Sequence, residues 1–385
     1  MKPAKLLLTL LITLTPSLCR AVEPWEEFAV RPGTDDQEMP AIYSDIIVWQ
    51  QFVAEFGDYD VYVADLNAPD DPLLFALGEE GDQINPAVYE DVVVWQDFIA
   101  TDAGGDWDIS GADISDANEA FIFAVSGIED NDEQNPAIAG NIVVWQDGPA
   151  GDADIYGADI TDQANPTEFV IAGFDFDQAG PALYRTTVVW QDKYFGDFDI
   201  PAADILQRNK PALFDFLLLE HNQQEPAISG DIVVWQDNFS GDWDIYAARI
   251  SEPNKIAELP IATAEASQTN PAIDGNIIVW QDDRAGNWDI FGYNLTTGRR
   301  FRITDEPHDQ INPAISGNTV VFQDNRDGHW QIYAVRLDGP KVAYCPTRLP
   351  GDVNNDCKVD FDDFTLMASN WLECHLQPQQ ACPSF

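Results

Sequence analysis

The chain has 385 residues, of which 67 are Asp or Glu and 19 are Lys or Arg, so its formal charge is −48. Hydrophobic residues make up 45% and aromatic residues 11%, which is typical of a globular protein and not of a disordered acidic tail. The strong negative charge repels phosphate backbones and anionic lipid, so the composition argues against nucleic-acid binding and against close membrane contact.

Residues 1–21 form a predicted signal peptide. Lys2 and Lys5 precede an apolar run, Leu6 to Leu14, and small residues suit cleavage after Ala21. That run is too short to span a bilayer comfortably, which takes about 20 residues, and no later stretch is apolar enough. We therefore expect an exported protein without a membrane span, which is secreted, periplasmic or held at the cell surface.

Residues 22–337 repeat one phrase seven times. A copy reads Asn-Pro-Ala-Ile-Ala-Gly-Asn-Ile-Val-Val-Trp-Gln-Asp from Asn135, followed by Asp-Ile-Tyr-Gly-Ala-Asp from Asp154. A Gly-Asn or Gly-Asp pair predicts a tight hairpin, and the Ile-Val-Val-Trp run predicts a strand that is covered on both faces. Two further strand segments complete each unit, and a period of about 45 residues with four strands predicts a propeller blade. The copies centre on Trp49, Trp95, Trp145, Trp190, Trp235, Trp280 and Phe322.

The predicted fold is therefore all-β, a seven-bladed propeller of four-stranded blades. Glu27 to Val30 resembles a fourth-strand segment and precedes the first full copy. We expect this N-terminal strand to complete the last blade, which closes the ring and removes its exposed edges.

The repeated phrase resembles the propeller repeats of the TolB type, which share the Pro-x-Ile-x-Gly, Trp-x-Asp and Asp-Ile-Tyr elements. The resemblance covers about residues 28 to 337 and implies the fold without implying an activity. Peptidases with such propellers add a hydrolase domain, and this chain has no Gly-x-Ser-x-Gly motif.

Polar and aromatic residues recur at fixed places in the repeat. The aspartates after the tryptophans, such as Asp97 and Asp237, either hydrogen-bond their own turns or help to hold Ca²⁺ or a cationic partner. Amides that precede each blade either bond neighbouring blades or bind a ligand at the channel mouth, and aromatics at the start of the third strand either pack or stack on sugar rings. The candidate ligand-binding residues are Gln37, Gln83, Gln178, Gln223, Gln268, Gln310, Trp107, Trp243, Trp288 and Trp330, with Glu133 in the remaining amide position.

Enzyme chemistry has few candidates in this region. His221 and His308 occupy equivalent blade-joining loops, each two residues before a glutamine of the amide series. Some seven-bladed propeller lyases use histidines and a glutamine near the channel to bind a metal, which the pair resembles. The sequence favours a non-catalytic binding or scaffolding propeller with a protein or polysaccharide ligand. The alternative is a polysaccharide-active propeller enzyme, a metal-dependent lyase or a glycoside hydrolase.

The C-terminal residues form a separate predicted module, residues 351–385, after a linker at 338–350. A twelve-residue loop from Asp352 has the spacing of an EF-hand, and the run from Phe364 to Leu372 reads as a helix. The expected cofactor is Ca²⁺. Its predicted ligands are Asp352, Asn354, Asp356, the carbonyl of Lys358, Asp360 and Asp363.

The loop resembles one type I dockerin repeat, which has Asp at its twelfth position. Dockerins normally carry two repeats and bind cohesin modules, often beside polysaccharide-degrading domains, so the resemblance implies a cohesin-like or cell-surface partner. Four cysteines follow the propeller, and an even number in an exported chain predicts two disulfides with three possible pairings. They are Cys345, Cys357, Cys374 and Cys382.

Overall fold

The computed structural model describes residues 25–67, 73–78, 80–101, 104–116, 119–127, 131–149, 151–193, 196–217, 219–251 and 257–337. These ranges belong to one compact unit, Trp25–Leu337. The predicted signal peptide, the linker, the calcium loop and the four cysteines lie outside the described residues.

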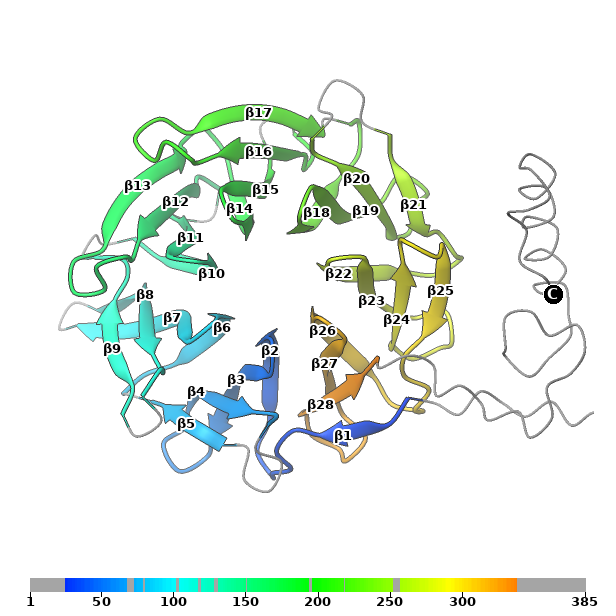
Figure 1. Cartoon of the computed structure of the whole chain (residues 1–385), viewed down its shortest axis with the longest axis horizontal. Helices are drawn as coiled ribbons and strands as arrows, with labels where there is room; N and C mark the ends of the chain where they lie inside the picture. Colours follow the sequence, from blue (N-terminus) through cyan, green and yellow to red (C-terminus); the bar gives the residue numbers. More distant parts are fainter. Residues whose placement is uncertain are drawn as a thin grey trace, which may run out of the picture. The chain divides into compact units, whose positions relative to one another are not determined.

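Seven antiparallel sheets of four strands surround a central axis (Figure 1), which confirms the predicted seven-bladed propeller. Blades 1 to 4 contain β2 (Gln37–Tyr43), β3 (Ile46–Val53), β4 (Asp58–Asp65), β5 (Leu73–Leu77), β6 (Gln83–Tyr89), β7 (Val92–Thr101), β8 (Gly104–Asp113), β9 (Phe121–Ala124), β10 (Glu133–Ala139), β11 (Ile142–Asp147), β12 (Asp154–Asp159), β13 (Thr167–Ala172), β14 (Gln178–Tyr184), β15 (Thr187–Asp192), β16 (Ile200–Asp204) and β17 (Ala212–Leu217). Blades 5 to 7 contain β18 (Gln223–Ser229), β19 (Ile232–Asp237), β20 (Asp244–Arg249), β21 (Leu259–Ala262), β22 (Gln268–Asp274), β23 (Ile277–Asp282), β24 (Asp289–Asn294), β25 (Arg299–Arg302), β26 (Gln310–Ser316), β27 (Thr319–Asp324), β28 (Gln331–Arg336) and β1 (Glu27–Ala29).

The N-terminal strand closes the ring as predicted. β1 pairs antiparallel with β28, and Phe28 lies opposite Ala334. In Figure 1 the dark blue β1 lies along the outer edge of the blade that holds the orange β28. Arg326 reinforces this closure because its guanidinium bonds both Glu27 on β1 and Asp324 on β27.

The hydrophobic core lies between neighbouring blades. One cluster joins Ile42 and Trp49 of blade 1 to Val321 and Ile332 of blade 7, and equivalent clusters lie at the other blade boundaries. The second-strand aromatics fill these layers and are at most 2% exposed: Trp49, Trp95, Trp145, Trp190, Trp235, Trp280 and Phe322. Each second strand is covered on both faces, which explains why its sequence is a continuous apolar run.

A glutamine that follows each of these aromatics links its blade to the next. The Gln236 Oε1 atom accepts a hydrogen bond of 3.1 Å from the backbone N–H of Asn270 in the following blade. The receiving residue has a positive φ of about 50° in every blade, at the point where the first strand is irregular. The glutamines that accept these seven hydrogen bonds are Gln50, Gln96, Gln146, Gln191, Gln236, Gln281 and Gln323.

Antiparallel order gives the disc two different faces. We call "hairpin face" the face that carries the turns between first and second strands, such as the turn at Ser44 and Asp45. We call the opposite face the "loop face", because it carries the blade-joining loops such as residues 173–177. Among the described residues, no helix is long and apolar enough to cross a bilayer.

Candidate functional site

The predicted amide ligands lie at the loop face, each as the first residue of its blade. Gln37, Gln83, Gln178, Gln223, Gln268 and Gln310 are at most 1% exposed. Their amides bond the loop that enters the blade: Gln178 Nε2 donates to the Phe176 carbonyl at 2.6 Å, and Gln268 Nε2 to the Ala266 carbonyl at 2.8 Å. A ligand reaches these amides only if the loops move, so their ligand-binding role stays a prediction.

The predicted stacking residues Trp107, Trp243, Trp288 and Trp330 are half-buried at the start of the third strands. Their backbone groups join blades. The Trp243 carbonyl accepts from Gln268 N at 2.7 Å, and the Trp288 carbonyl accepts from Gln310 N at the same distance. Trp288 N in turn donates to Asp309 Oδ1 at 3.0 Å. The alanine at the equivalent position, Ala153, makes the same backbone bond to Gln178, so these bonds do not depend on an aromatic side chain. Sugar stacking on the tryptophans stays a prediction.

Three of the repeated turn aspartates, Asp237, Asp282 and Asp324, bond their own turns, whereas Asp97 accepts from the side chains of Gln83 and Ser110. Asp237 Oδ1 accepts from Phe239 N at 2.8 Å, and Asp324 Oδ1 accepts from Arg326 N at the same distance. This pattern, an acceptor two residues before its donor, is the Asx-turn. Among the described residues, no group of three or more His, Cys, Asp and Glu side chains is placed to hold a metal ion.

Cross-strand pairing also places acidic residues side by side at the loop-face ends of the strands. Asp192 bridges to Asp199, and burial raises the pKa of Asp199 to about 6. In blade 3 an acidic residue occupies the amide position, and burial together with a hydrogen bond to Asp108 raises the pKa of Glu133 to about 9. A carboxyl group in an apolar layer keeps its proton because the charged form is poorly solvated there.

The two candidate histidines lie in loops that are separated by the loop into blade 6. His221 Nδ1 is 3.0 Å from Asp237 Oδ1, and its ring lies 4.9 Å from the ring of the exposed Phe239. The carbonyl of His308 accepts hydrogen bonds from Asn287 and Gln310. The structure thus gives His221 a carboxylate partner and gives the main chain of His308 a loop-building role.

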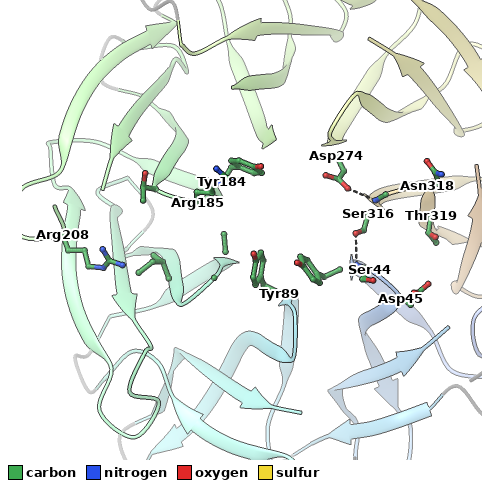
Figure 2. Close-up of a pocket in the computed structure, with 16 residues that line it drawn as sticks. Ser44, Asp45, Tyr89, Tyr184, Arg185, Arg208, Asp274, Ser316, Asn318 and Thr319 are labelled. Carbon is green, nitrogen blue, oxygen red and sulfur yellow. Dashed lines mark hydrogen bonds between the residues drawn. The ribbon is translucent and has the colours of Figure 1, made fainter. Parts of the chain in front are cut away.

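A cavity of about 830 Å³ opens at the hairpin face, and its lining comes from turns of six of the seven blades. Figure 2 shows Tyr89 and Tyr184 on one side of this opening, with Asp274 across it. The lining comes mainly from the last residue of the first strand and from the hairpin turn that follows it: Tyr43, Ser44, Asp45, Tyr89, Ala139, Gly140, Tyr184, Arg185, Thr186, Asp274, Ser316, Gly317 and Asn318, with Ile142, Arg208 and Thr319 beside them.

This ring of turns departs from sevenfold regularity in three blades. Blades 3, 5, 6 and 7 end their first strand in Ala, Ser or Asp and turn through a glycine with φ between 55° and 64°. Blades 1, 2 and 4 instead have a tyrosine followed by a residue with a side chain, in the same left-handed conformation. These pairs are Tyr43-Ser44, Tyr89-Glu90 and Tyr184-Arg185. Blade construction does not require this exception, because four blades form the turn without it.

The tyrosines from blades 1 and 2 form one wall. The ring centroids of Tyr43 and Tyr89 are 4.5 Å apart, and burial together with a hydrogen bond to Tyr89 raises the pKa of Tyr43 to about 12. Among the turns of blades 1, 6 and 7, Ser44 N donates to Ser316 Oγ at 2.8 Å and Gly317 N donates to Asp274 Oδ2 at 2.6 Å (Figure 2). These bonds fix neighbouring turns to each other, so the cavity is preformed.

The residues that the seven copies share give no sign of this cavity. The available signal was the difference between copies: the position before each hairpin turn holds Tyr43, Tyr89 and Tyr184 in three blades and small or acidic residues in the others. Their convergence on one opening follows from ring closure, which the sequence pattern also predicted.

Comparison with solved structures finds propellers. A puromycin-hydrolysing peptidase of Mycobacterium tuberculosis matches at 12% identity and a TM-score of 0.62, over 83% of this chain. This chain spans about half of that peptidase, 55% of its length. The β-propeller domain of the trilobed protease from Pyrococcus furiosus matches at 10% identity and a TM-score of 0.58, over 82% of this chain and 98% of that one.

An oligogalacturonate lyase of Vibrio parahaemolyticus matches at 11% identity and a TM-score of 0.58, over 81% of this chain and 94% of that one. TolB from Acinetobacter baumannii also matches, with a TM-score of 0.43 that is too low to carry an argument. At these identities the likeness shows the propeller fold alone. No protein-family model matches the sequence, and no curated protein matches it.

Proposed function

We propose that this chain is an exported, non-catalytic propeller that binds a polysaccharide in the cavity on its hairpin face. The observation that carries the proposal is the set of tyrosines that breaks the sevenfold repeat at the 830 Å³ cavity. Aromatic rings offer flat apolar surfaces to the C–H faces of sugars, and a preformed concave site with a few polar groups is typical of ligand binding. Hydroxyl, amide and charged groups from Ser44, Asn318 and Arg185 supply such polar contacts.

The test is binding of the full chain to a panel of soluble plant and algal polysaccharides, measured by affinity electrophoresis and calorimetry. Tyr184→Ala and Tyr89→Ala should each weaken binding at least tenfold, because each removes a wall of the cavity. Phe56→Ala is the matched control, since Phe56 is 72% exposed in a turn on the loop face. Binding that is lost in Phe56→Ala and retained in both tyrosine variants would place the site elsewhere.

We further propose that the C-terminal module binds Ca²⁺ and docks the propeller to a cohesin-like or cell-surface protein. The support is the spacing of oxygen ligands from Asp352 to Asp363 in the sequence. In the full chain, Asp352→Ala combined with Asp363→Ala should abolish one tight calcium site in calorimetry, while Asp362→Ala, at a non-ligand position, should keep it. Pulldown from culture supernatant with and without the last 45 residues then tests docking.

The second candidate is a polysaccharide-active propeller enzyme. One observation favours it: His221 Nδ1 lies 3.0 Å from Asp237 Oδ1, and a carboxylate that orients a histidine is a common feature of proton-transfer sites. Activity on the same glycan panel that disappears in His221→Ala and His308→Ala, and survives in Tyr184→Ala, would favour the enzyme over the binding propeller.

A further inference from the structure

Arg185 occupies a backbone position that suits glycine. Its φ is 56°, and the equivalent residue in blades 3, 5, 6 and 7 is a glycine with the same conformation. The left-handed region is unfavourable for a residue with a Cβ atom, and such strain is concentrated at functional sites. A long cationic side chain at this turn is therefore retained at a cost to stability.

The charge of Arg185 has no ion-pair partner among the described residues of the propeller. The side chain is exposed at the cavity, and its guanidinium lies 5.5 Å from the ring centroid of Tyr184. Arg185 makes no ion pair with any residue that the structure describes, although the chain has 67 acidic residues against 19 basic ones. Arg249 and Arg326, in contrast, each bond a carboxylate directly.

Charge is distributed unevenly around the cavity. Blade 4 contributes Arg185, and its outer turn on the same face carries Arg208, which reaches Asp159 of blade 3 at 2.8 Å. Across the opening the lining is acidic, with Asp274 and Asp45 (Figure 2). An anionic group of a ligand is therefore most favourable at the junction of blades 3 and 4.

Small residues line the cavity at that same junction. Blade 3 ends its first strand in Ala139-Gly140, between the blades that carry Tyr89 and Tyr184. A Cβ atom added to Gly140 would meet nothing within 4 Å, so the surface above it is open. The cavity lining at this junction therefore has a tyrosine on either side, small residues between them and the exposed Arg185 beside Tyr184, and we call this part of the lining the notch.

We propose that this notch binds an acidic sugar unit, with Tyr89 and Tyr184 against the ring and Arg185 paired to its carboxylate. This inference rests on the proposed polysaccharide-binding function and adds the chemical class of the ligand. A guanidinium presents two parallel N–H donors to a carboxylate, which selects a planar anion as well as a charge.

The test compares hexamers of a uronic acid with the same hexamers after reduction of their carboxyl groups to the neutral sugar. Calorimetry on the full chain should show at least tenfold tighter binding of the acidic hexamer, and this preference should disappear in Arg185→Ala. Tyr184→Ala should weaken both ligands. Arg299→Ala is the matched control, because Arg299 is also exposed, on the outer strand β25, and lies outside the cavity lining.

Two outcomes overturn the inference and differ in what they mean for the function. Equal binding of both hexamers, weakened by Tyr184→Ala and unaffected by Arg185→Ala, refutes the acidic-sugar site and retains the polysaccharide-binding propeller. Failure of every polysaccharide and hexamer to bind refutes both. A sulfated neutral hexamer that binds as tightly as the uronic acid would show that Arg185 recognises charge without selecting the planar carboxylate, which also contradicts the proposal.

Discussion

Replacing Arg185 by glycine should stabilise the propeller and remove its preference for acidic ligands at the same time. The native φ is 56°, and glycines in four equivalent turns have φ between 55° and 64°, so the backbone needs no adjustment. A left-handed conformation costs a residue with a Cβ atom about 1–2 kcal/mol. Glycine also gives the unfolded chain more conformational freedom, which offsets about 0.4–1 kcal/mol of the stability gained by removing this strain. The expected net gain in unfolding free energy is about 0.5–1 kcal/mol.

The measurement is urea denaturation followed by tryptophan fluorescence, with the midpoint compared at an unchanged slope. Gly140→Ser is the reverse control: the turn at Gly140 has the same conformation and open space for a Cβ atom, so the serine should cost about 1 kcal/mol through φ alone. A lower stability of Arg185→Gly, or a neutral effect of Gly140→Ser, would refute the argument that backbone strain at this turn is borne for the sake of a side chain.

Three further changes test the construction of the ring. Glu133→Gln should stabilise the chain by about 1–3 kcal/mol at pH 8 and less at pH 5. The carboxyl of Glu133 has a pKa of about 9 in the folded protein and of 4.5 as its ordinary value. The unfolded state therefore loses this proton first, and stability falls as the pH rises between these two values. The amide of the variant does not titrate, so urea titrations should show a smaller fall. Gln236→Ala leaves the N–H of Asn270 without its 3.1 Å acceptor and should cost about 1–3 kcal/mol, measured against Gln207→Ala in an exposed turn. Arg326→Ala leaves the fully buried Asp324 without its ion-pair partner and should lower the unfolding free energy by about 3–5 kcal/mol. Amide hydrogen exchange in β1 should become faster, and unchanged exchange there would contradict the role of Arg326 in ring closure.

The fold could be read from the sequence because each blade repeats local signals. The Ile-Val-Val-Trp run, the Gly-Asn turns and the 45-residue period are properties of short segments, and a strand buried on both faces needs apolar residues at every position. Even closure by Glu27–Ala29 was predictable, since an unpaired outer-strand segment at the start of the chain complements the missing strand at its end.

The recurring polar residues were harder to interpret from their positions alone. Gln178 and Gln268 were predicted as candidate ligands, and the structure buries them against the carbonyls of Phe176 and Ala266. A sequence shows that an amide recurs and does not show whether its partner is a neighbouring loop or a bound molecule. That distinction depends on the distance between groups in different segments, which folding determines.

The sequence by itself determined the number of blades, the strands within them and the way the ring closes, because these depend on patterns shared by all seven copies. Tertiary structure alone decided that Tyr43, Tyr89 and Tyr184, up to 141 positions apart (184 − 43), surround one cavity together with Arg185. The physical reason is that a closed ring brings the end of every first strand to the same axis, so differences between distant copies become neighbours in space.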